Sequence, residues 1–296
     1  MIPLKEAYKY KELVGNKAYY LSLVKQKFLT PNGFVVTLED NDYTIEKALN
    51  QYNYRFYSIR SSSFDEDTKE KANAGKYESY IRVPKRKALF YIKKIQEKGI
   101  PVLVTKYIKA QYHGVGFVYN KTIIELSKRF ATEESDVIYI DGKRIYKNLD
   151  LFNKKVDSLL DRIKNKINEI RKYMGFDIDI EFAYNKRLYV LQVRPITKTI
   201  PENPNIIVIS PGIMEGPVKY IKSEKDKIEG IIYVNRLYYW LSKYLDKIKG
   251  IIVKEPTFLS HLAINLRENN IPCVALDFVP KYVRINTYKG IFEYEK

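Results

Sequence analysis

Cysteine and histidine are scarce in this chain, which has one cysteine, Cys273, and two histidines, His113 and His261, among 296 residues. A single cysteine excludes an internal disulfide and a zinc site built from several cysteines. No apolar run approaches the roughly 18–20 residues that a membrane-spanning helix needs. Charged residues within the first eleven positions interrupt any apolar signal-peptide core. We therefore expect a cytoplasmic protein that does not contact a membrane.

Positive charge is in large excess, with 52 Lys and Arg against 35 Asp and Glu and a formal net charge of +17. An excess of this size is typical of proteins that bind nucleic acid, anionic membranes or phosphorylated small molecules. Here the basic residues are spread along the chain and form no arm or tail. A lysine-rich surface is therefore the simpler interpretation, and nucleic acid is not the expected partner. A phosphate-bearing ligand stays open.

Patterning along the chain predicts an α/β (α+β) protein of two domains. The stretch "IPENPN" at 200–205 is the best linker candidate because it combines two prolines with polar residues. Before it, helical and strand patterns are mixed, and residues 152–174 predict a long amphipathic helix that ends at Gly175. After it, short apolar runs alternate with helical stretches. We expect domains at 1–200, with subdomains of roughly 1–100 and 101–200, and at 201–296.

A β-hairpin is predicted at 177–194, where two alternating runs flank Asn185-Lys186 as a two-residue turn. This turn would pair Tyr184 with Arg187. Side chains alternate between the two faces of a strand, so one face is expected to be core. The expected core residues are Ile178, Ile180, Phe182, Tyr189, Leu191 and Val193. The expected polar residues of the other face are Asp179, Glu181, Gln192 and Arg194.

The polar face of this hairpin is a candidate metal and phosphate site. The predicted register makes Glu181 and Gln192 diagonal neighbours, roughly 7–8 Å apart at Cα. Carboxylate and amide oxygens beside Arg194, with Asp179 adjacent, suit Mg²⁺, which takes one or two carboxylates and completes its shell with substrate phosphates. An ordinary solvated sheet face is the alternative interpretation, and a one-residue change in the loop would reverse the two faces.

Two segments near the N-terminus offer positive groups to a polyphosphate. In "SIRSSS", residues 58–63, Arg60 ends a predicted strand and is followed by three hydroxyl groups. In "VGNKAYYL", residues 14–21, Lys17 lies at a helix start preceded by Gly15, where an anion is favoured. Each signal is weak alone because lysine is abundant, and the sequence has neither a P-loop nor a GxGxxG motif.

His261 lies where a predicted strand gives way to a predicted helix. "GIIVK" at 250–254, a helix at 261–268 and "IPCVAL" at 271–276 form a β-α-β pattern. Ser260 is a natural N-cap, and a helix N-terminus stabilises a phosphorylated side chain. Neutral imidazole is a good nucleophile near pH 7. A lone histidine is more often structural, which is the interpretation we give to His113.

Taken in order, these segments resemble the phosphoenolpyruvate synthase and pyruvate phosphate dikinase family. "LVGNKAYYLSLV" is similar to its VGGKGANL segment, "PNGFVVT" to PPGFVVT, and "SIRSSSFDEDTKEKANAGKYES" to VRSSATxED…AGQYES. "DIEFAYNKRLYVLQVRPIT" is similar to DIEWA…LYxLQxRPxT, and "SPGIMEGPV" to SPGxAxGxV. "FLSHLAINLRENNIPCVA" is similar to TSHAAIxARExGIPxVxG. The matches span nearly the whole chain, and the hairpin and histidine segments are the most specific.

The resemblance implies an ATP-grasp nucleotide-binding domain followed by a phosphohistidine swivelling domain. It assigns roles to six residues: Lys17 and Arg60 on the ATP phosphates, Glu181 and Gln192 on Mg²⁺ and nucleotide, Arg194 in phosphoryl transfer, and His261 as the phosphoryl carrier. The implied activity is of the pyruvate, water dikinase type, in which His261 is phosphorylated from Mg-ATP, AMP is released, and the phosphoryl group passes to an acceptor. Pyruvate, on a separate barrel subunit, is the acceptor this implies.

The chain also departs from the family pattern at several positions. Asn16 and Ala18 replace two glycines of VGGKG, and residues 256–259, "PTFL", replace GGxT before the histidine. The FTRDP segment is missing after "HGVGFV", and the pyruvate-binding barrel does not follow the histidine domain. Two alternatives therefore stay open: a phosphotransferase for another small molecule, like the family's antibiotic-modifying relatives, and a non-catalytic regulatory or nucleic-acid-binding protein.

Overall fold

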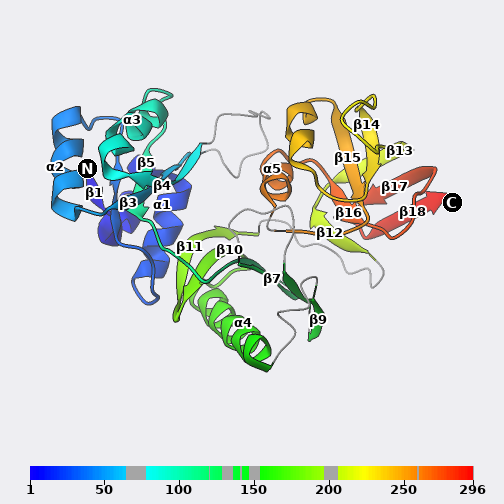
Figure 1. Ribbon diagram of the computed structural model, residues 1–296, viewed down its shortest axis with the longest axis horizontal. Helices are drawn as coiled ribbons and strands as arrows, with labels where there is room; N and C mark the ends of the chain where they lie inside the picture. Colours follow the sequence, from blue (N-terminus) through cyan, green and yellow to red (C-terminus); the bar gives the residue numbers. More distant parts are fainter. Residues whose placement is uncertain are drawn as a thin grey trace. The chain divides into compact units, whose positions relative to one another are not determined.

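The computed structural model describes residues 1–64, 78–119, 121–128, 136–140, 142–146, 154–196, 206–258 and 260–295. The chain forms two compact units of mixed α/β structure, each with its own core (Figure 1). Unit 1 holds the described residues up to Val118 together with 158–195. Unit 2 holds the described residues of 119–157 and of 196–296. The predicted division into domains at 1–200 and 201–296 stays a prediction, and the linker candidate at 200–205 lies outside the described residues.

The first sheet of unit 1 has the strand order β1-β2-β5-β3-β4. Its strands are β1 (Ile2–Pro3), β2 (Gly33–Val36), β3 (Phe56–Ser61), β4 (Ser79–Pro84) and β5 (Val102–Lys106). The helices that accompany it are η1 (Leu4–Lys9), α1 (Lys11–Lys25), α2 (Asp42–Tyr52) and α3 (Lys85–Gln96). Apolar residues of α2 and α3, such as Ile45 and Ile92, share a fully buried cluster with Ile59 and Val104 of the sheet. One face of the sheet is therefore sealed by helices, and β3 must present its other side chains on the opposite face.

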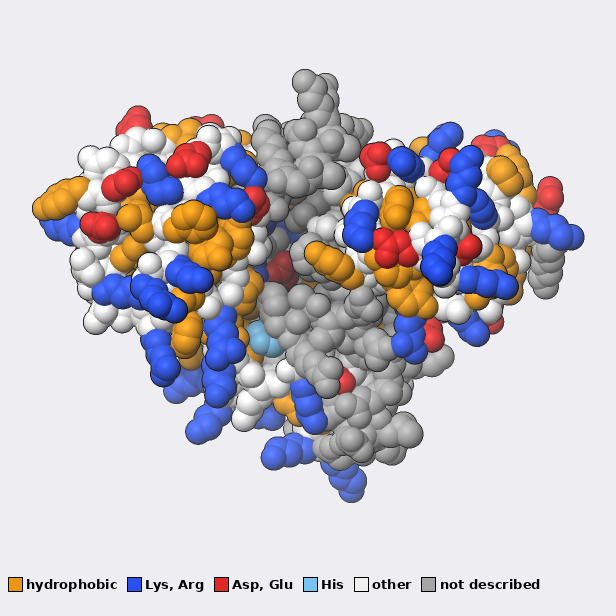
Figure 2. All heavy atoms as spheres, turned by 45° about the horizontal axis from the view of Figure 1, so that its top comes forward, with side chains coloured by type: hydrophobic (Ala, Val, Ile, Leu, Met, Phe, Trp, Pro, Cys, Tyr) orange, Lys and Arg blue, Asp and Glu red, His pale blue; other side chains and the backbone are white. Residues whose placement is uncertain are grey.

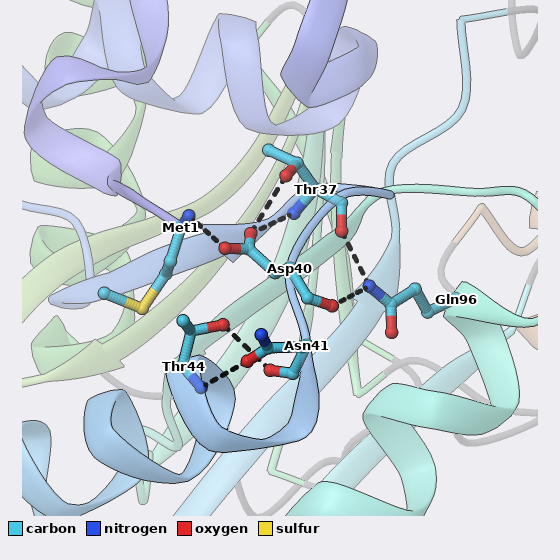
Figure 3. A network of polar contacts seen from close by, with 6 residues as sticks. All are labelled: Met1, Thr37, Asp40, Asn41, Thr44 and Gln96. Carbon is cyan, nitrogen blue, oxygen red and sulfur yellow. Dashed lines mark hydrogen bonds and ion pairs between the residues drawn. The ribbon is translucent and has the colours of Figure 1, made fainter.

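Asp40 ties the N-terminus to this sheet and its helices (Figure 3). Its carboxylate accepts hydrogen bonds from the terminal amine and from the backbone N–H and hydroxyl of Thr37, at 2.8 and 2.9 Å for the last two. The amide of Gln96, at the end of α3, donates to the carbonyl oxygens of Thr37 and Asp40. Asn41 next to it caps α2 by accepting from the N–H of Thr44 at 3.0 Å.

The second sheet of unit 1 places β10 (Ile178–Asn185) between β11 (Arg187–Pro195) and β6 (Tyr112–Val118), all antiparallel. Helix α4 (Lys154–Met174) buries its apolar stripe, as the periodicity predicted. A Cβ built on Gly116 of β6 would lie 2.8 Å from Ile167 Cδ1, so this glycine lets α4 pack directly on the sheet. Gly175 ends the helix with φ +76.

The hairpin forms, but its predicted register is wrong. Lys186 alone makes the turn, with φ 59, so that Asn185 pairs with Arg187 and Tyr184 with Leu188. A β-bulge between the pairs of Phe182 and Glu181 then leaves Leu191 as an extra residue. Val190 is buried in place of the expected Leu191, and both Leu191 and Tyr189 are only half-buried. The turn and the bulge each shift the pairing by one residue. Because side chains alternate faces with a period of two, a total shift of two keeps Asp179, Glu181, Gln192 and Arg194 on the predicted face.

The large sheet of unit 2 has the order β12-β16-β15-β14-β13-β17-β18. Its strands are β12 (Ile207–Ser210), β13 (Ile213–Tyr220), β14 (Gly230–Val234), β15 (Ile248–Val253), β16 (Cys273–Ala275), β17 (Tyr282–Asn286) and β18 (Ile291–Glu295). The helical segments of this region are η3 (Tyr239–Tyr244) and α5 (His261–Glu268). Strands β13, β14, β15 and β16 are parallel neighbours. The predicted β-α-β unit is therefore present as β15-α5-β16.

Unit 2 also contains the antiparallel strands β7 (Thr122–Ser127), β8 (Val137–Ile140) and β9 (Lys143–Tyr146). In the described part of the chain, no helix is both long and apolar enough to cross a membrane. On the face drawn in Figure 2, Lys and Arg side chains are spread over the described surface among Asp and Glu, as the even distribution of charge along the sequence predicted.

Candidate functional site

Arg60, Glu181 and Gln192 meet in a buried polar cluster within unit 1. Nη1 of Arg60 donates to Oε2 of Glu181 at 2.9 Å and to Oε1 of Gln192 at 3.1 Å. The latter two residues lie directly opposite each other on β10 and β11, not diagonally. Arg60 lies near the end of β3, 121 positions from Glu181 in the sequence. The fold therefore brings together two segments that the sequence suggested independently.

Asp179 and Arg194 form the next pair along the same face of the hairpin. They are direct cross-strand partners, and Nη2 of Arg194 donates to Oδ2 of Asp179 at 3.3 Å. Both residues are only 9% exposed. Two carboxylates, one amide oxygen and two guanidinium groups thus share one buried surface. A solvated sheet face, the alternative interpretation of this pattern, does not describe these side chains.

Gly15 and Ala18 connect α1 to the serine stretch after β3. Gly15 interrupts α1 with φ 71, and a Cβ at this position would lie 1.7 Å from the carbonyl oxygen of Ser62. The N–H of Ala18 donates to Oγ of Ser62 at 3.0 Å. Lys17, on the first turn after the kink, is 7% exposed, and its charge acts on Glu181. The glycine is required because only a residue without Cβ permits this close approach.

The electrostatics of the cluster keep Glu181 ionised. Burial acts to raise the pKa of Glu181, but the positive charges of Arg60 and Arg194, the Arg60 hydrogen bond and the charge of Lys17 outweigh burial and hold the pKa below its usual range. Arg60, Arg194 and Lys17 together stand against the carboxylates of Glu181 and Asp179, which leaves a net positive charge of one in the cluster. The site is therefore suited to a ligand with several negative charges.

His113 belongs to the same surface, which the sequence did not suggest. It pairs with Ala183 across β6 and β10, and so lies on the face that carries Glu181. Burial first, and then the charge of Arg60, lower the pKa of His113 to about 4. His113 is thus neutral at physiological pH. The strand pattern around it was visible in the sequence, but its neighbours depend on which strand pairs with β6, and periodicity does not give that.

Mg²⁺ fits the donor set of this site. Within the described ranges, no group of three or more His, Cys, Asp and Glu side chains converges to form a complete metal cage. The carboxylates of Glu181 and Asp179 and the amide oxygen of Gln192 are hard oxygen donors on one face. Mg²⁺ needs only one or two carboxylates when substrate phosphates supply further ligands. These three residues are the ones that would hold it.

The histidine segment lies in unit 2, at the carboxyl end of β15. Helix α5 begins at His261, and Ser260 caps it as predicted, its Oγ accepting from the N–H of Ala263 at 3.1 Å. The side chain of His261 lies outside the described part of the structure, as does Leu259. The described backbone places His261 at a strand-to-helix junction, where sites occur in parallel α/β sheets.

Glu125 holds the loop that precedes α5. This residue of β7 is completely buried. Its carboxylate accepts a hydrogen bond from the hydroxyl of Thr257 at 2.8 Å and another from the N–H of Phe258. Both donors stand in "PTFL", the segment that departs from the GGxT of the resembling family. A buried carboxylate thus supports this loop through two bonds.

Comparison with known proteins assigns no family to the chain. No family model matches it, and no curated protein matches it. Among solved structures, a D-alanine–D-alanine ligase from Bacillus anthracis aligns over 61% of this chain and 56% of its own at 14% identity, with a TM-score of 0.39. An N5-carboxyaminoimidazole ribonucleotide synthetase, solved as its ADP complex, aligns over 66% and 47% at 10% identity, with a TM-score of 0.40. The VanG D-Ala:D-Ser ligase from Enterococcus faecalis aligns over 61% of this chain and 52% of its own at 15% identity, with a TM-score of 0.39.

The chain spans about half the length of these solved structures. Likenesses this distant assign neither the fold family nor the activity. They do not show the phosphoenolpyruvate synthase family that the motifs resemble. In the described part of the chain, the cluster on β3, β10 and β11 is where charged and metal-binding side chains gather.

Proposed function

We propose that the chain is an ATP-dependent phosphotransferase, in which an ATP-grasp nucleotide-binding domain phosphorylates His261 on a phosphohistidine domain. The observation that supports this most strongly is the bond network from Arg60 to Glu181 and Gln192. Three segments that each resemble a nucleotide-binding motif of the phosphoenolpyruvate synthase family contribute to one buried cluster. A chance resemblance of isolated segments would not lead them to converge.

The cations of the cluster would bind the triphosphate. Guanidinium groups form paired, charge-assisted bonds with phosphate oxygens, a geometry open to Arg60 and Arg194. Lys17 adds a point charge at the start of a helical turn, where backbone N–H groups also favour an anion. Glu181, Asp179 and Gln192 would hold Mg²⁺, which neutralises phosphate charge. Positioning and charge neutralisation are the main contributions that a protein makes to phosphoryl transfer.

The proposed transfer to His261 proceeds in two balanced steps. A nitrogen of the neutral imidazole attacks the β-phosphorus of ATP, the bond from that phosphorus to the α,β-bridging oxygen breaks, and AMP leaves. The terminal phosphoryl group of the resulting pyrophosphohistidine then passes to water or to inorganic phosphate. Phosphohistidine remains. The start of α5 suits this product because its free N–H groups and dipole stabilise an anion at the first helical turn.

The phosphohistidine then needs an acceptor. The resemblance points to pyruvate, bound by a separate barrel subunit, and a different small molecule is the second candidate. The described cluster is the nucleotide half of the reaction and does not distinguish the two acceptors. The activity proposed for this chain is therefore the formation of phosphohistidine from Mg-ATP.

Labelled ATP tests this proposal directly. Incubation with β-³²P-ATP and Mg²⁺ should leave label on the intact chain that is stable in alkali and lost in acid, while γ-label should be released. His261→Ala should abolish the label without changing ATP binding. Arg60→Ala should abolish both, and Arg86→Ala, which removes an equal charge from the exposed surface of α3, should change neither.

The outcomes separate the alternatives. Absence of β-label on the intact chain under conditions where it binds ATP would contradict the phosphotransferase and favour a non-catalytic nucleotide sensor. Label that persists in His261→Ala would place the acceptor elsewhere. With phosphohistidine established, labelled chain should transfer its phosphoryl group to pyruvate only when a barrel subunit is added.

A further inference from the structure

A cavity of about 790 Å³ lies at one end of the first sheet of unit 1, apart from the proposed nucleotide site. Phe56, the first residue of β3, and Lys106, the last residue of β5, both line it. Arg60 lies four residues further along β3, which at the rise of a strand is about 13 Å away. The volume is in the range of small-molecule sites, which run from roughly 300 to 1,000 Å³.

Four cations line this cavity: Arg55, Arg82, Lys106 and Lys109. No Asp or Glu is among the described residues that line it. Within the described part of the chain, none of the four cations forms an ion pair with a carboxylate. The chain offers many carboxylates elsewhere, and Lys98 and Lys243, for example, are paired with them. All four side chains are exposed, so water and salt screen their mutual repulsion, and an anion bound between them would be attracted by all four at low ionic strength.

Aromatic rings stand among these cations. The guanidinium groups of Arg55 and Arg82 lie 5.3 and 5.4 Å from the centre of the Phe56 ring, and Nζ of Lys106 lies 5.6 Å from that of Tyr54. Contacts of this kind hold the cations over ring faces without neutralising them. Tyr107 adds a further ring to the wall. A ligand that combined negative charge with a flat ring would find partners for both.

Arg82, which lines this cavity, has a strained backbone conformation. β4 carries a bulge between the partners of Tyr57 and Ile59, so that Ile81 and Arg82 stand opposite Ser58 alone. Arg82 adopts φ 58, a left-handed conformation that is unfavourable for a residue with a Cβ. A bulge redirects a side chain, and here it brings a second guanidinium onto the ring that Arg55 already covers. The strained backbone of Arg82 thus places a second positive charge beside that of Arg55.

We propose that this cavity is a second anion site, which takes a small phosphorylated molecule carrying an aromatic or heterocyclic ring and two negative charges. The phosphate lies among Arg55, Arg82, Lys106 and Lys109, and the ring of the ligand packs against Tyr107, since Phe56 and Tyr54 already carry cations on their rings. The site does not depend on the proposed function, because its residues are separate from those of the nucleotide cluster. A ligand bound here is a candidate substrate or effector.

Binding of uridine 5′-monophosphate, followed by calorimetry at low salt, tests the site. One equivalent should bind to the intact chain, and uncharged uridine should not bind detectably. The double variant Arg55→Gln with Arg82→Gln should weaken binding at least tenfold. Arg86→Gln with Lys87→Gln, which removes the same charge from exposed positions of α3, should change it less than twofold. Equal weakening in the two doubles would reveal a non-specific effect of the +17 charge and overturn the proposal.

Two further variants separate the parts of the site. Tyr107→Leu should weaken uridine monophosphate binding about tenfold and leave inorganic pyrophosphate binding unchanged, since stacking on a base is worth about that much. Arg82→Gly should lose affinity while the melting temperature stays equal or rises, because glycine adopts the observed φ without strain. Unchanged affinity in Arg82→Gly would overturn the role of Arg82. The melting temperature of this variant shows that it is folded.

A last comparison distinguishes this site from the nucleotide cluster and from a nucleic-acid surface. Arg60→Ala should remove ATP binding and leave uridine monophosphate binding intact, and loss of both would merge the two sites and overturn the proposal. Decauridylate should bind no more than a few-fold tighter than the monophosphate. Affinity that rises steeply with oligonucleotide length would instead assign the cavity to nucleic acid. If the chain binds uridine monophosphate but does not label His261, the second anion site is supported and the proposed phosphotransferase activity is not.

Discussion

Arg60 is the residue on which the buried cluster depends. Its guanidinium donates hydrogen bonds to both Glu181 and Gln192, and all three side chains are largely removed from water. Removing one member of a buried ion pair leaves the other charge less compensated, here by Arg194 and Lys17 only, which costs more than the pair contributes. Arg60 therefore matters for stability as well as for any ligand.

We predict that Arg60→Ala lowers the free energy of unfolding by about 3 kcal/mol. The double variant Arg60→Met with Glu181→Gln should recover most of that loss, because neither an unpaired charge nor a cavity remains. Urea unfolding followed by circular dichroism measures both. A double variant less stable than Arg60→Ala would show that Glu181 is stabilised by its other neighbours, Lys17 and Arg194.

His113 should make the stability of unit 1 depend on pH. Its pKa is lowered to about 4 in the folded chain, so between pH 4 and 6.5 the unfolded chain binds more protons at this residue. Stability should rise as the pH rises through this window, by up to about 3 kcal/mol in total. His113 makes no further contribution to the pH dependence above pH 7.

Chemical unfolding at a series of pH values checks this prediction, with His113→Gln as the comparison. In His113→Gln, the rise in the free energy of unfolding between pH 4 and 6.5 should lose the contribution of His113. Glu181, whose pKa is lowered, contributes stability that is present above its unfolded pKa and is lost only at more acidic pH. A slope that is the same in both proteins would contradict the burial of a neutral His113.

At the scale of elements, the kink in α1 locks this helix to the strand β3. Gly15 and Gly99 have nearly equal φ values, 71 and 74, but a Cβ would meet the Ser62 carbonyl at 1.7 Å in the first case and nothing within 4 Å in the second. Gly99→Ala should therefore cost only the conformational strain, about 1–2 kcal/mol. Gly15→Ala should cost at least twice as much and displace Lys17. Thermal unfolding of the two variants gives the comparison, and equal costs would contradict the contact.

The loop before α5 should depend on Glu125 of β7. Because this buried carboxylate accepts from Thr257 and Phe258, we predict that Glu125→Ala speeds hydrogen exchange at the Phe258 amide at least tenfold. Thr257→Val, which removes one donor, should have a smaller effect. An unchanged exchange rate in Glu125→Ala would show that the loop is held by other contacts.

Elements with a strong local pattern could be predicted from the sequence, and their pairing could not. The period of α4, the N-cap at Ser260 and the β15-α5-β16 unit depend on neighbours in the sequence. The hairpin register failed because a one-residue turn with positive φ at Lys186 and a bulge at Leu191 leave no mark on the alternation. The Arg60–Glu181 contact joins residues 121 positions apart, and only motif resemblance suggested that they act together.

At the scale of the whole molecule, the two units can be followed separately because the rare residues are in one of them. Cys273 on β16 and Trp240 in η3, the single cysteine and the single tryptophan, both belong to unit 2. Cys273 is completely buried, and burial raises the pKa of its thiol. A buried thiol with a raised pKa is inert, so its reaction reports opening of the fold.

We predict that thiol labelling of Cys273 in native buffer is at least a thousandfold slower than in the unfolded chain. In a urea titration, labelling and Trp240 fluorescence should change together, since both residues belong to unit 2. Labelling that precedes the fluorescence change would show that β16 detaches before the rest of its sheet.

The turn at Lys186 and the bulge at Leu191 behave like two compensating frameshifts. Each alone would exchange the inside and outside of every later residue of β11, and together they restore the alternation before Gln192 and Arg194. A single insertion or deletion in this hairpin therefore reverses the faces of β11, and only a second, compensating change restores them. Loss of Leu191 alone would turn Gln192 and Arg194 into the core and bring Val193 to the polar face, ending the site without touching a residue that belongs to it.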